Sequence, residues 1–157
     1  MAWNATVMSY IVTTQLWPGR LIAAVQVRIV RSQIPVEFMR HLDQVYAAKA
    51  TGLALDGQNV FVYSGVTGQP DLLDCAFGVG VAARFEPIGN VRPIEIPSGE
   101  VATTTHIGPY SGLPAANQAV KEWCARNPRK SGGLSWEVYG HWREGEPPRT
   151  DVYYLLS

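Results

Sequence analysis

A single carboxylate stands among aromatic rings in residues 132–142, whose sequence is Gly-Gly-Leu-Ser-Trp-Glu-Val-Tyr-Gly-His-Trp. The aromatic and β-branched residues of this segment predict a strand. Because residues two apart share one face of a strand, we expect Glu137, Tyr139 and His141 to point the same way. A carboxylate among rings costs free energy unless a cation or a hydrogen-bond donor meets it. The segment therefore predicts a cavity that binds a small, flat, cationic molecule.

Further aromatic residues could line such a cavity. The complete set of predicted ligand-binding residues is Glu137, Tyr139, Tyr63, Tyr110, Tyr153, Phe61, Trp136, Trp123 and His141. Aromatic faces that meet a cation contribute about 0.5 to 2 kcal/mol each. A few rings and one carboxylate would therefore be enough for micromolar binding.

The leading members of this set also have a purely structural interpretation. Glu137 could lie on an ordinary solvated strand face, and a tyrosine in a strand, such as Tyr139 or Tyr63, is often simply packed. Tyr110 follows Gly-Pro just before a predicted helix, where it could enter the cavity or only cap the core. The sequence leaves these alternatives open.

The remaining candidates depend on the face that each residue presents. Trp123 lies on the apolar stripe of a predicted helix, which favours core packing. Trp136 alternates away from Glu137 and would reach the cavity only if its strand were bulged. The histidines are expected to be structural or exposed and not catalytic; they are His41, His106 and His141.

Composition and charge restrict the class of protein. Among the 157 residues, 46% are hydrophobic and 17% are charged, as expected for one folded globular domain. The 13 basic residues balance the 13 acidic ones, so the chain lacks the positive charge of a nucleic-acid-binding protein. We therefore expect no direct contact with nucleic acid.

Metal, cofactor and membrane binding are not expected either. Cys75 and Cys124 are far apart in the sequence and have no closely spaced histidine partner, so we predict no metal site. The N-terminus lacks the basic and apolar regions of a signal peptide, and the apolar residues 21–27 are far fewer than a membrane helix needs. These features favour a cytoplasmic protein without cofactors.

Hydrophobic periodicity predicts two groups of elements, each with a strand, a helix and two further strands. The predicted strands cover residues 7–14, 20–31, 59–63 and 72–82 in the first half and 100–107, 134–142 and 151–156 in the second. The predicted helices run from Pro35 to Thr51-Gly52 and over residues 113–126. Residues 85–96 contain Pro87 and Pro93, show little periodicity and are expected to connect the halves.

The repeated order of elements predicts a duplicated domain. Val62-Tyr63 in the first half matches Val138-Tyr139 in the second, each in the strand after the helix. We expect one domain over residues 1–157, with pseudo-repeat halves at about 1–84 and 97–157. Two such halves would lie side by side about a pseudo-two-fold axis, with a ligand cleft at their junction.

Three segments together resemble a known family: Pro-Ser-Gly-Glu-Val-Ala-Thr-Thr-Thr-His-Ile-Gly-Pro-Tyr at 97–110, Trp-Glu-Val-Tyr at 136–139 and Thr-Asp-Val-Tyr-Tyr-Leu-Leu at 150–156. They are similar to the GyrI-like small-molecule-binding family, which includes the effector-binding domains of multidrug-responsive regulators of the AraC and MerR types. The resemblance implies an α+β fold, in which duplicated strand-helix-strand-strand units form a curved antiparallel sheet with two helices and a central ligand cleft. It also implies that Glu137 meets cationic aromatic ligands, and it favours Tyr153 over Tyr154 as a cleft residue.

Two features depart from the family pattern. Leu155 stands where the family often has proline, which bears on the last strand and not on the cleft. No helix-turn-helix segment is recognisable, so a role in transcription regulation would require a partner. Both a partner protein and a homodimer are left open.

The leading functional hypothesis is a stand-alone protein that captures hydrophobic aromatic cations, for multidrug sensing or sequestration. The alternative, which the resemblance implies, is a hydrolase that opens the cyclopropane rings of aromatic toxins. Glu137 would then be the general base, and the hydroxyl of Tyr139 or Tyr110 would polarise the carbonyl. A third hypothesis, inhibition of DNA gyrase, gains little support from a chain without net charge.

Overall fold

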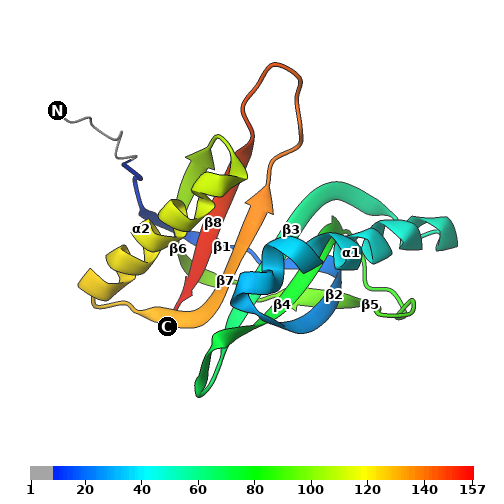
Figure 1. Ribbon diagram of the computed structural model, residues 1–157, viewed down its shortest axis with the longest axis horizontal. Coiled ribbons are helices and arrows are strands. Elements are labelled where there is room, and N and C mark those ends of the chain that lie inside the picture. Colours follow the sequence, from blue (N-terminus) through cyan, green and yellow to red (C-terminus); the bar gives the residue numbers. More distant parts are fainter. Residues whose placement is uncertain (1–8) are drawn as a thin grey trace.

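The computed structural model of the chain describes residues 9–157, so positions 7 and 8 of the first predicted strand lie outside the described residues. Within residues 9–157, eight strands form one sheet and two α-helices pack on it (Figure 1). The strands are β1 Thr13–Trp17, β2 Arg20–Val30, β3 Leu55–Val66, β4 Gln69–Val81, β5 Val91–Ile96, β6 Gly99–Ile107, β7 Ser131–Tyr139 and β8 Arg149–Leu156. The helices are α1 Ile34–Ala47 and α2 Leu113–Arg126, with short 3-10 turns η1 Arg31–Gln33, η2 Ala48–Thr51 and η3 Tyr110–Gly112.

The order of the strands displays the internal repeat. They follow each other as β1-β6-β8-β7-β3-β4-β2-β5, so the unit β2-α1-β3-β4 meets the unit β6-α2-β7-β8 along β3 and β7. The strand that precedes each unit crosses to the other one: β1 pairs with β6, and β5 pairs with β2. All of these pairings are antiparallel. The predicted α+β fold, with duplicated units, a curved antiparallel sheet and two helices, is confirmed.

Both helices cover the same face of the sheet (Figure 1). Helix α1 packs on β2 and β4, whereas α2 packs on β6 and β8. Each helix has a proline in its first turn, where the missing N–H costs nothing, and each buries an apolar stripe. The stripes include Leu42 and Val45 in α1 and Ala116 and Val120 in α2. Neither helix is long and apolar enough to cross a membrane, and this holds for residues 9–157 as a whole.

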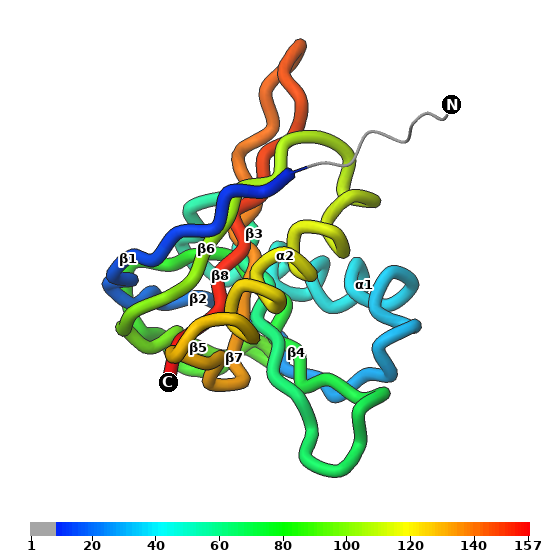
Figure 2. Tube along the Cα trace, turned by 90° about the vertical axis from the view of Figure 1, so that its left-hand side faces the viewer, coloured from blue at the N-terminus to red at the C-terminus, as the bar shows by residue number. Residues whose placement is uncertain are grey.

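Much of the opposite face of the sheet is buried because the sheet curls on itself. Two short connections, Pro18-Gly19 between β1 and β2 and Pro97-Ser98 between β5 and β6, join strands from opposite ends of the strand order. Gly19 has a φ of 88°, and a Cβ there would lie 3.3 Å from the carbonyl oxygen of Ile96. Figure 2 shows the two ends of the sheet close together. One core cluster contains buried residues from both ends and from the centre, among them Trp17, Ile22, Ile96, Val101 and Trp136.

Several predicted boundaries differ from the structure. The first strand is Thr13–Trp17 and not 7–14, because residues 9–12 lie in no strand, and β3 spans Leu55–Val66 and not 59–63. Val91–Ile96 form the edge strand β5 inside the predicted connector, and an edge strand tolerates Pro93 because one of its sides needs no ladder hydrogen bonds. Strand β7 ends at Tyr139, so His141 lies beyond it in an exposed loop. The boundaries of the halves, near residues 84 and 97, stay a prediction.

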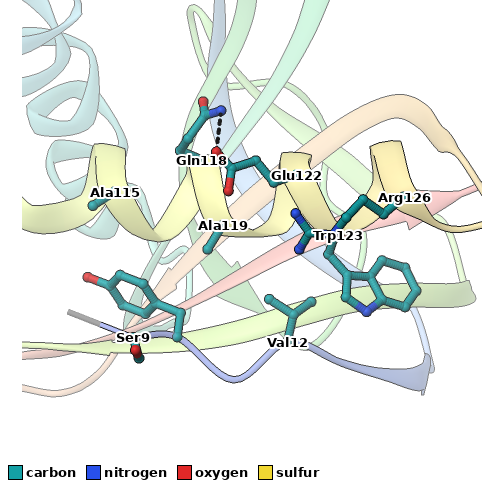
Figure 3. Close-up of a pocket in the computed structure, with 9 residues that line it drawn as sticks. Ser9, Val12, Ala115, Gln118, Ala119, Glu122, Trp123 and Arg126 are labelled. Atoms are coloured by element: carbon teal, nitrogen blue, oxygen red, sulfur yellow. Dashed lines mark hydrogen bonds between the residues drawn. The ribbon is translucent and has the colours of Figure 1, made fainter. Parts of the chain in front are cut away.

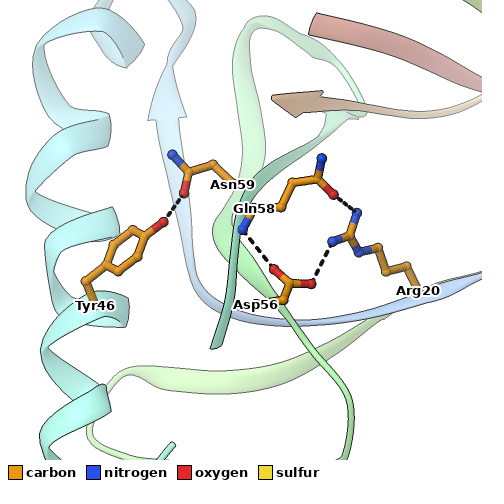
Figure 4. A network of polar contacts seen from close by, with 5 residues as sticks. All are labelled: Arg20, Tyr46, Asp56, Gln58 and Asn59. Carbon is orange, nitrogen blue, oxygen red and sulfur yellow. Dashed lines mark hydrogen bonds and ion pairs between the residues drawn. The ribbon is translucent and has the colours of Figure 1, made fainter. Parts of the chain in front are cut away.

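A polar network ties the start of β3 to the rest of the first unit (Figure 4). Arg20 of β2 forms an ion pair with Asp56 of β3 at 2.9 Å. The pair crosses Gly80 of β4, where a Cβ would collide with both side chains. On the helix side, the hydroxyl of Tyr46 in α1 donates to Asn59 Oδ1. The network fixes the β3 segment that leads into the central strand pair.

Candidate functional site

Glu137 lies at the centre of the sheet, on the face that the helices cover. It belongs to β7, and its register partner in β3 is Phe61. Register partners of an antiparallel pair lie side by side on one face, together with the residues two positions away. Tyr139 and Tyr63 are therefore on this face as well. Glu137 is only 7% exposed, so its carboxylate is a buried polar group.

Three side-chain donors meet the buried carboxylate. The hydroxyl of Tyr139 donates to Glu137 Oε1 at 2.6 Å, and that of Tyr63 donates to the same oxygen at 3.3 Å. The amide of Asn117 in α2 donates to Glu137 Oε2 at 2.9 Å. These bonds replace part of the hydration that the carboxylate loses on burial. Tyr63 comes from the first unit and the other two donors from the second, so both units build the site.

Asn117 is a site residue that the sequence prediction missed. Its amide nitrogen also donates to the Leu113 carbonyl at 3.1 Å, and its Oδ1 accepts a hydrogen bond from the Tyr154 hydroxyl at 2.8 Å. These contacts orient the amide with its nitrogen toward Glu137. An asparagine within a helix has no spacing that marks it as the partner of a strand residue. Only the packing of α2 on the sheet reveals it.

The pKa values of the two tyrosines beside Glu137 are raised by their surroundings. Burial raises the pKa of Tyr63 well above its ordinary value of 10.0, and the charge of Glu137 raises it further. Burial likewise raises the pKa of Tyr139, and the neighbouring Tyr63 and Glu137 add to the effect. Both hydroxyls therefore stay protonated at neutral pH and act as donors to the carboxylate.

Aromatic rings surround the carboxylate on the helix-covered face. Phe61 lies edge-on to Tyr139, with ring centroids 4.9 Å apart, and edge-on to Phe77 at 5.1 Å. Phe38 of α1 packs over Phe61 at 5.7 Å. Tyr110 is 55% exposed and meets Tyr139 edge-on at 5.6 Å. This aromatic group, formed by Phe38, Phe61, Phe77, Tyr110 and Tyr139, begins at the surface and ends beside the carboxylate.

The turn that presents Tyr110 is held by a buried histidine. His106, which is 1% exposed, bonds through Nε2 to the Pro109 carbonyl at 2.8 Å. Since a carbonyl can only accept, Nε2 carries the proton, and Nδ1 accepts from the Tyr10 hydroxyl at 2.8 Å. A Cβ at Gly112 would lie 2.5 Å from His106 Cε1, so glycine is required there. His106 thus fixes the turn before α2 by its own contacts.

Four predicted ligand-binding residues lie away from the aromatic group. Trp136 is fully buried on the opposite face of β7, where it stacks on Tyr153 with centroids 5.8 Å apart and packs against Trp17. Trp123 is half-buried on α2, where it packs near the segment that precedes β1. His141 is exposed beyond the end of β7. A role of these four residues in binding stays a prediction.

Two surface hollows also lie away from Glu137. The hollow in Figure 3, of about 400 Å³, runs between α2 and residues 9–12; its lining is Ser9, Tyr10, Val12, Ala115, Gln118, Ala119, Glu122, Trp123 and Arg126. A second, of about 440 Å³, surrounds the Arg28–Asp74 ion pair. The charged residues of both hollows are at least partly exposed, so neither holds a buried charge like that of Glu137. Within residues 9–157, no group of three His, Cys, Asp or Glu side chains is placed to hold a metal ion.

A family model matches the sequence, and known structures share the fold. The family model of the GyrI-like small molecule binding domain matches residues 46–155. The EcmrR C-terminal domain superposes with a TM-score of 0.76 at 18% identity, over 96% of this chain and 99% of that one. SAV2435 bound to tetraphenylphosphonium superposes with a TM-score of 0.71 at 9% identity, over 96% of this chain and 94% of that one. A hydrolase from Listeria innocua superposes with a TM-score of 0.53 at 13% identity, over 93% of this chain and 91% of that one.

At these identities the structural similarities establish the fold alone. A comparison with curated protein sequences found no match. The family match rests on a different observation, because the family model covers sequence features of most of the chain. It includes β3, α2, β7 and most of β8, which are the elements that build the site around Glu137.

Proposed function

Because the chain belongs to the GyrI-like small-molecule-binding family, we propose that it captures hydrophobic aromatic cations at Glu137. The observation that carries this proposal is a buried carboxylate that has no cationic partner within the described residues 9–157. Glu137 is 7% exposed, and its side-chain hydrogen-bond partners within residues 9–157 are two tyrosines and one asparagine. The ion pairs of that part of the chain use other carboxylates. A ligand cation would supply the missing positive charge.

The aromatic group would bind the remainder of the ligand. Phe61 is the register partner of Glu137, so a cation near the carboxylate also lies beside an aromatic ring. Contacts between a cation and a ring contribute about 0.5 to 2 kcal/mol each. Micromolar binding corresponds to about 8 kcal/mol. A few such contacts, the attraction of the carboxylate and the burial of apolar ligand surface are together sufficient.

Ligand entry requires the aromatic group to open. Tyr110 is its most exposed member at 55%, and it meets Tyr139 through a single edge contact. We therefore expect Tyr110 to move aside while Tyr139 stays bonded to Glu137. SAV2435, which has the same fold, was solved with tetraphenylphosphonium, a bulky aromatic cation. That structure supports the proposal that this fold admits such a ligand.

A titration with flat cationic dyes, followed by tryptophan fluorescence, tests the proposal. The wild-type protein should show saturable quenching. Glu137→Gln keeps the shape of the side chain but removes its charge, and it should weaken binding at least about tenfold. Glu122→Gln removes an exposed carboxylate of α2 and should bind as the wild type does. Equal affinity of the Glu137→Gln variant would refute the role of the charge.

A second candidate function is the hydrolysis of cyclopropane-bearing aromatic toxins. It is favoured by the Tyr139 hydroxyl, 2.6 Å from Glu137, and by the fold shared with a hydrolase from Listeria innocua. Glu137 would take a proton from water while the water oxygen attacks a ring carbon. The ring C–C bond would break, and the released carbon would receive a proton, so the product gains one water. Mass spectrometry of the incubated toxin decides: that mass gain would establish turnover, whereas unchanged toxin would leave binding alone.

A further inference from the structure

Protein donors already occupy most of the acceptor positions of Glu137, and this restricts the headgroup that the site can bind. We propose that the site accepts cations with one hydrogen-bond donor or none, such as quaternary ammonium, phosphonium and tertiary ammonium ions, and rejects amidinium and guanidinium groups. This inference rests on the proposed function, because it defines the class of cation captured at Glu137. It depends on three residues, Tyr139, Tyr63 and Asn117, and on how they divide between the two carboxylate oxygens.

A carboxylate offers about four acceptor positions, two on each oxygen. Oε1 receives Tyr139 at 2.6 Å and Tyr63 at 3.3 Å, so both of its positions are used. Oε2 receives Asn117 at 2.9 Å and keeps one position. A ligand can therefore donate one hydrogen bond to Glu137, and only to Oε2.

Amidinium and guanidinium groups need a free acceptor position on each of the two carboxylate oxygens. Their planar fork places one N–H on each oxygen of a carboxylate. Since both acceptor positions of Oε1 are filled, the fork cannot bond to both oxygens of the carboxylate, and one of its arms loses that partner. A buried donor without a partner loses the free energy of its hydration. A quaternary cation has no such donor, and the ring faces compensate its charge.

The three protein donors are held to the carboxylate to different degrees. The Asn117 amide is fixed from both ends, by the Leu113 carbonyl and the Tyr154 hydroxyl. The raised pKa of Tyr63 and that of Tyr139 keep both hydroxyls protonated, so each continues to donate. The Tyr63 bond, at 3.3 Å, is the longest of the three and its loss is the simplest way to open a position on Oε1.

Two probes with one aromatic frame and one positive charge test the inference: biphenyl-4-yltrimethylammonium and biphenyl-4-carboxamidine. Calorimetry should show that the wild-type protein binds the trimethylammonium compound about tenfold more tightly or better, which corresponds to about 1.4 kcal/mol. Tyr63→Phe frees a position on Oε1 and should reduce this ratio at least threefold. Asn117→Ala frees a position on Oε2 only and leaves Oε1 filled, so it should reduce the ratio less than Tyr63→Phe does. Tyr46→Phe removes a hydroxyl that bonds to Asn59 and should leave the ratio unchanged.

The outcomes separate this inference from the proposed function. If the wild-type protein binds both probes equally, or if Tyr63→Phe does not change the ratio, the headgroup rule is wrong although cation capture stands. If neither probe nor any cationic dye binds, the proposed function fails and the headgroup rule fails with it. A reduced ratio in Tyr63→Phe and an unchanged ratio in Tyr46→Phe would support the rule.

Discussion

Phe61 and Glu137 are register partners on the two central strands, at the line where the two repeated units meet. The repeat aligns Val62-Tyr63 with Val138-Tyr139, so Phe61 and Glu137 are also equivalent positions of the two units. One unit thus contributes a ring and the other a carboxylate to the same place on the helix-covered face. The equivalent tyrosines, Tyr63 and Tyr139, both donate to Glu137. A symmetric scaffold therefore produces a site with an aromatic side and an anionic side.

The buried tyrosine hydroxyls predict a loss of stability at alkaline pH. Burial, aided by the charge of Glu137, raises the pKa of Tyr63 in the folded protein above 10.0, and burial also raises that of Tyr139. Above about pH 10 the unfolded chain has lost protons that the folded chain retains. The free energy of unfolding should then fall by about 1.4 kcal/mol per pH unit for each tyrosine.

Urea unfolding at pH 8, 10 and 11 checks this prediction. Tyr63→Phe and Tyr139→Phe should each show a smaller loss of stability between pH 10 and 11 than the wild type. The exposed Tyr110 offers the matched control, because Tyr110→Phe removes a hydroxyl from a ring at the surface. If the wild type and both site variants lose stability in parallel, the tyrosines do not hold their protons in the folded state.

The glycines of β4 predict different tolerances to alanine. A Cβ at Gly78 would lie 2.6 Å from the Ala23 carbonyl oxygen, so backbone would have to move, at a cost of about 1 to 3 kcal/mol. A Cβ at Gly80 would collide with the tips of Asp56 and Arg20, which can swing away. Gly80→Ala should then cost only the ion pair, about 1 kcal/mol or less.

Chemical denaturation of single and double variants tests both statements. In an Asp56→Ala background, Gly80→Ala should cost less than in the wild type, because part of the clash is already gone. Gly78→Ala should cost the same in both backgrounds. Additive effects of Gly80→Ala and Asp56→Ala would show that the pair does not cross the glycine as described.

We predict that replacing the buried His106 destabilises the protein far more than replacing the exposed His141. His106→Ala removes the bonds to the Pro109 carbonyl and the Tyr10 hydroxyl and leaves a cavity, so it should lower the free energy of unfolding by about 2 to 4 kcal/mol. His141→Ala, on the exposed loop after β7, should change it by about 0.5 kcal/mol or less. Thermal unfolding of the two variants measures the difference. Similar losses in both would contradict the structural role of His106.

Local signals in the sequence were sufficient for most of the fold. Apolar periodicity and first-turn prolines place α2 at residues 113–126, as observed. Alternation along β7 separates Glu137 and Tyr139 from Trp136, as the burial and contacts confirm. The exchange of β1 and β5 between the units could not be predicted, because it depends on the curl of the whole sheet.

The partners of Glu137 mark the limit of sequence reasoning about the site. Tyr139 could be predicted as a site residue because it lies two residues from Glu137 along the same strand. Tyr63 could be predicted because the repeat aligns it with Tyr139. Asn117 and Tyr154 could not be predicted, since their contacts with the site arise from the way α2 packs on β8. The prolines of residues 85–96 prevented the prediction of β5. An edge strand tolerates proline, but proline weakens the sequence pattern by which a strand is recognised.

The central claim is that the charge of Glu137 selects cations, and two ions of nearly the same shape and opposite charge test it most directly. Calorimetric titration of the wild-type protein with tetraphenylphosphonium and with tetraphenylborate should give saturable binding of the cation and at least about tenfold weaker binding of the anion. Glu137→Gln should remove most of that difference, and Glu122→Gln should preserve it. Equal binding of both ions by the wild type, or an unchanged preference in Glu137→Gln, would contradict the claim.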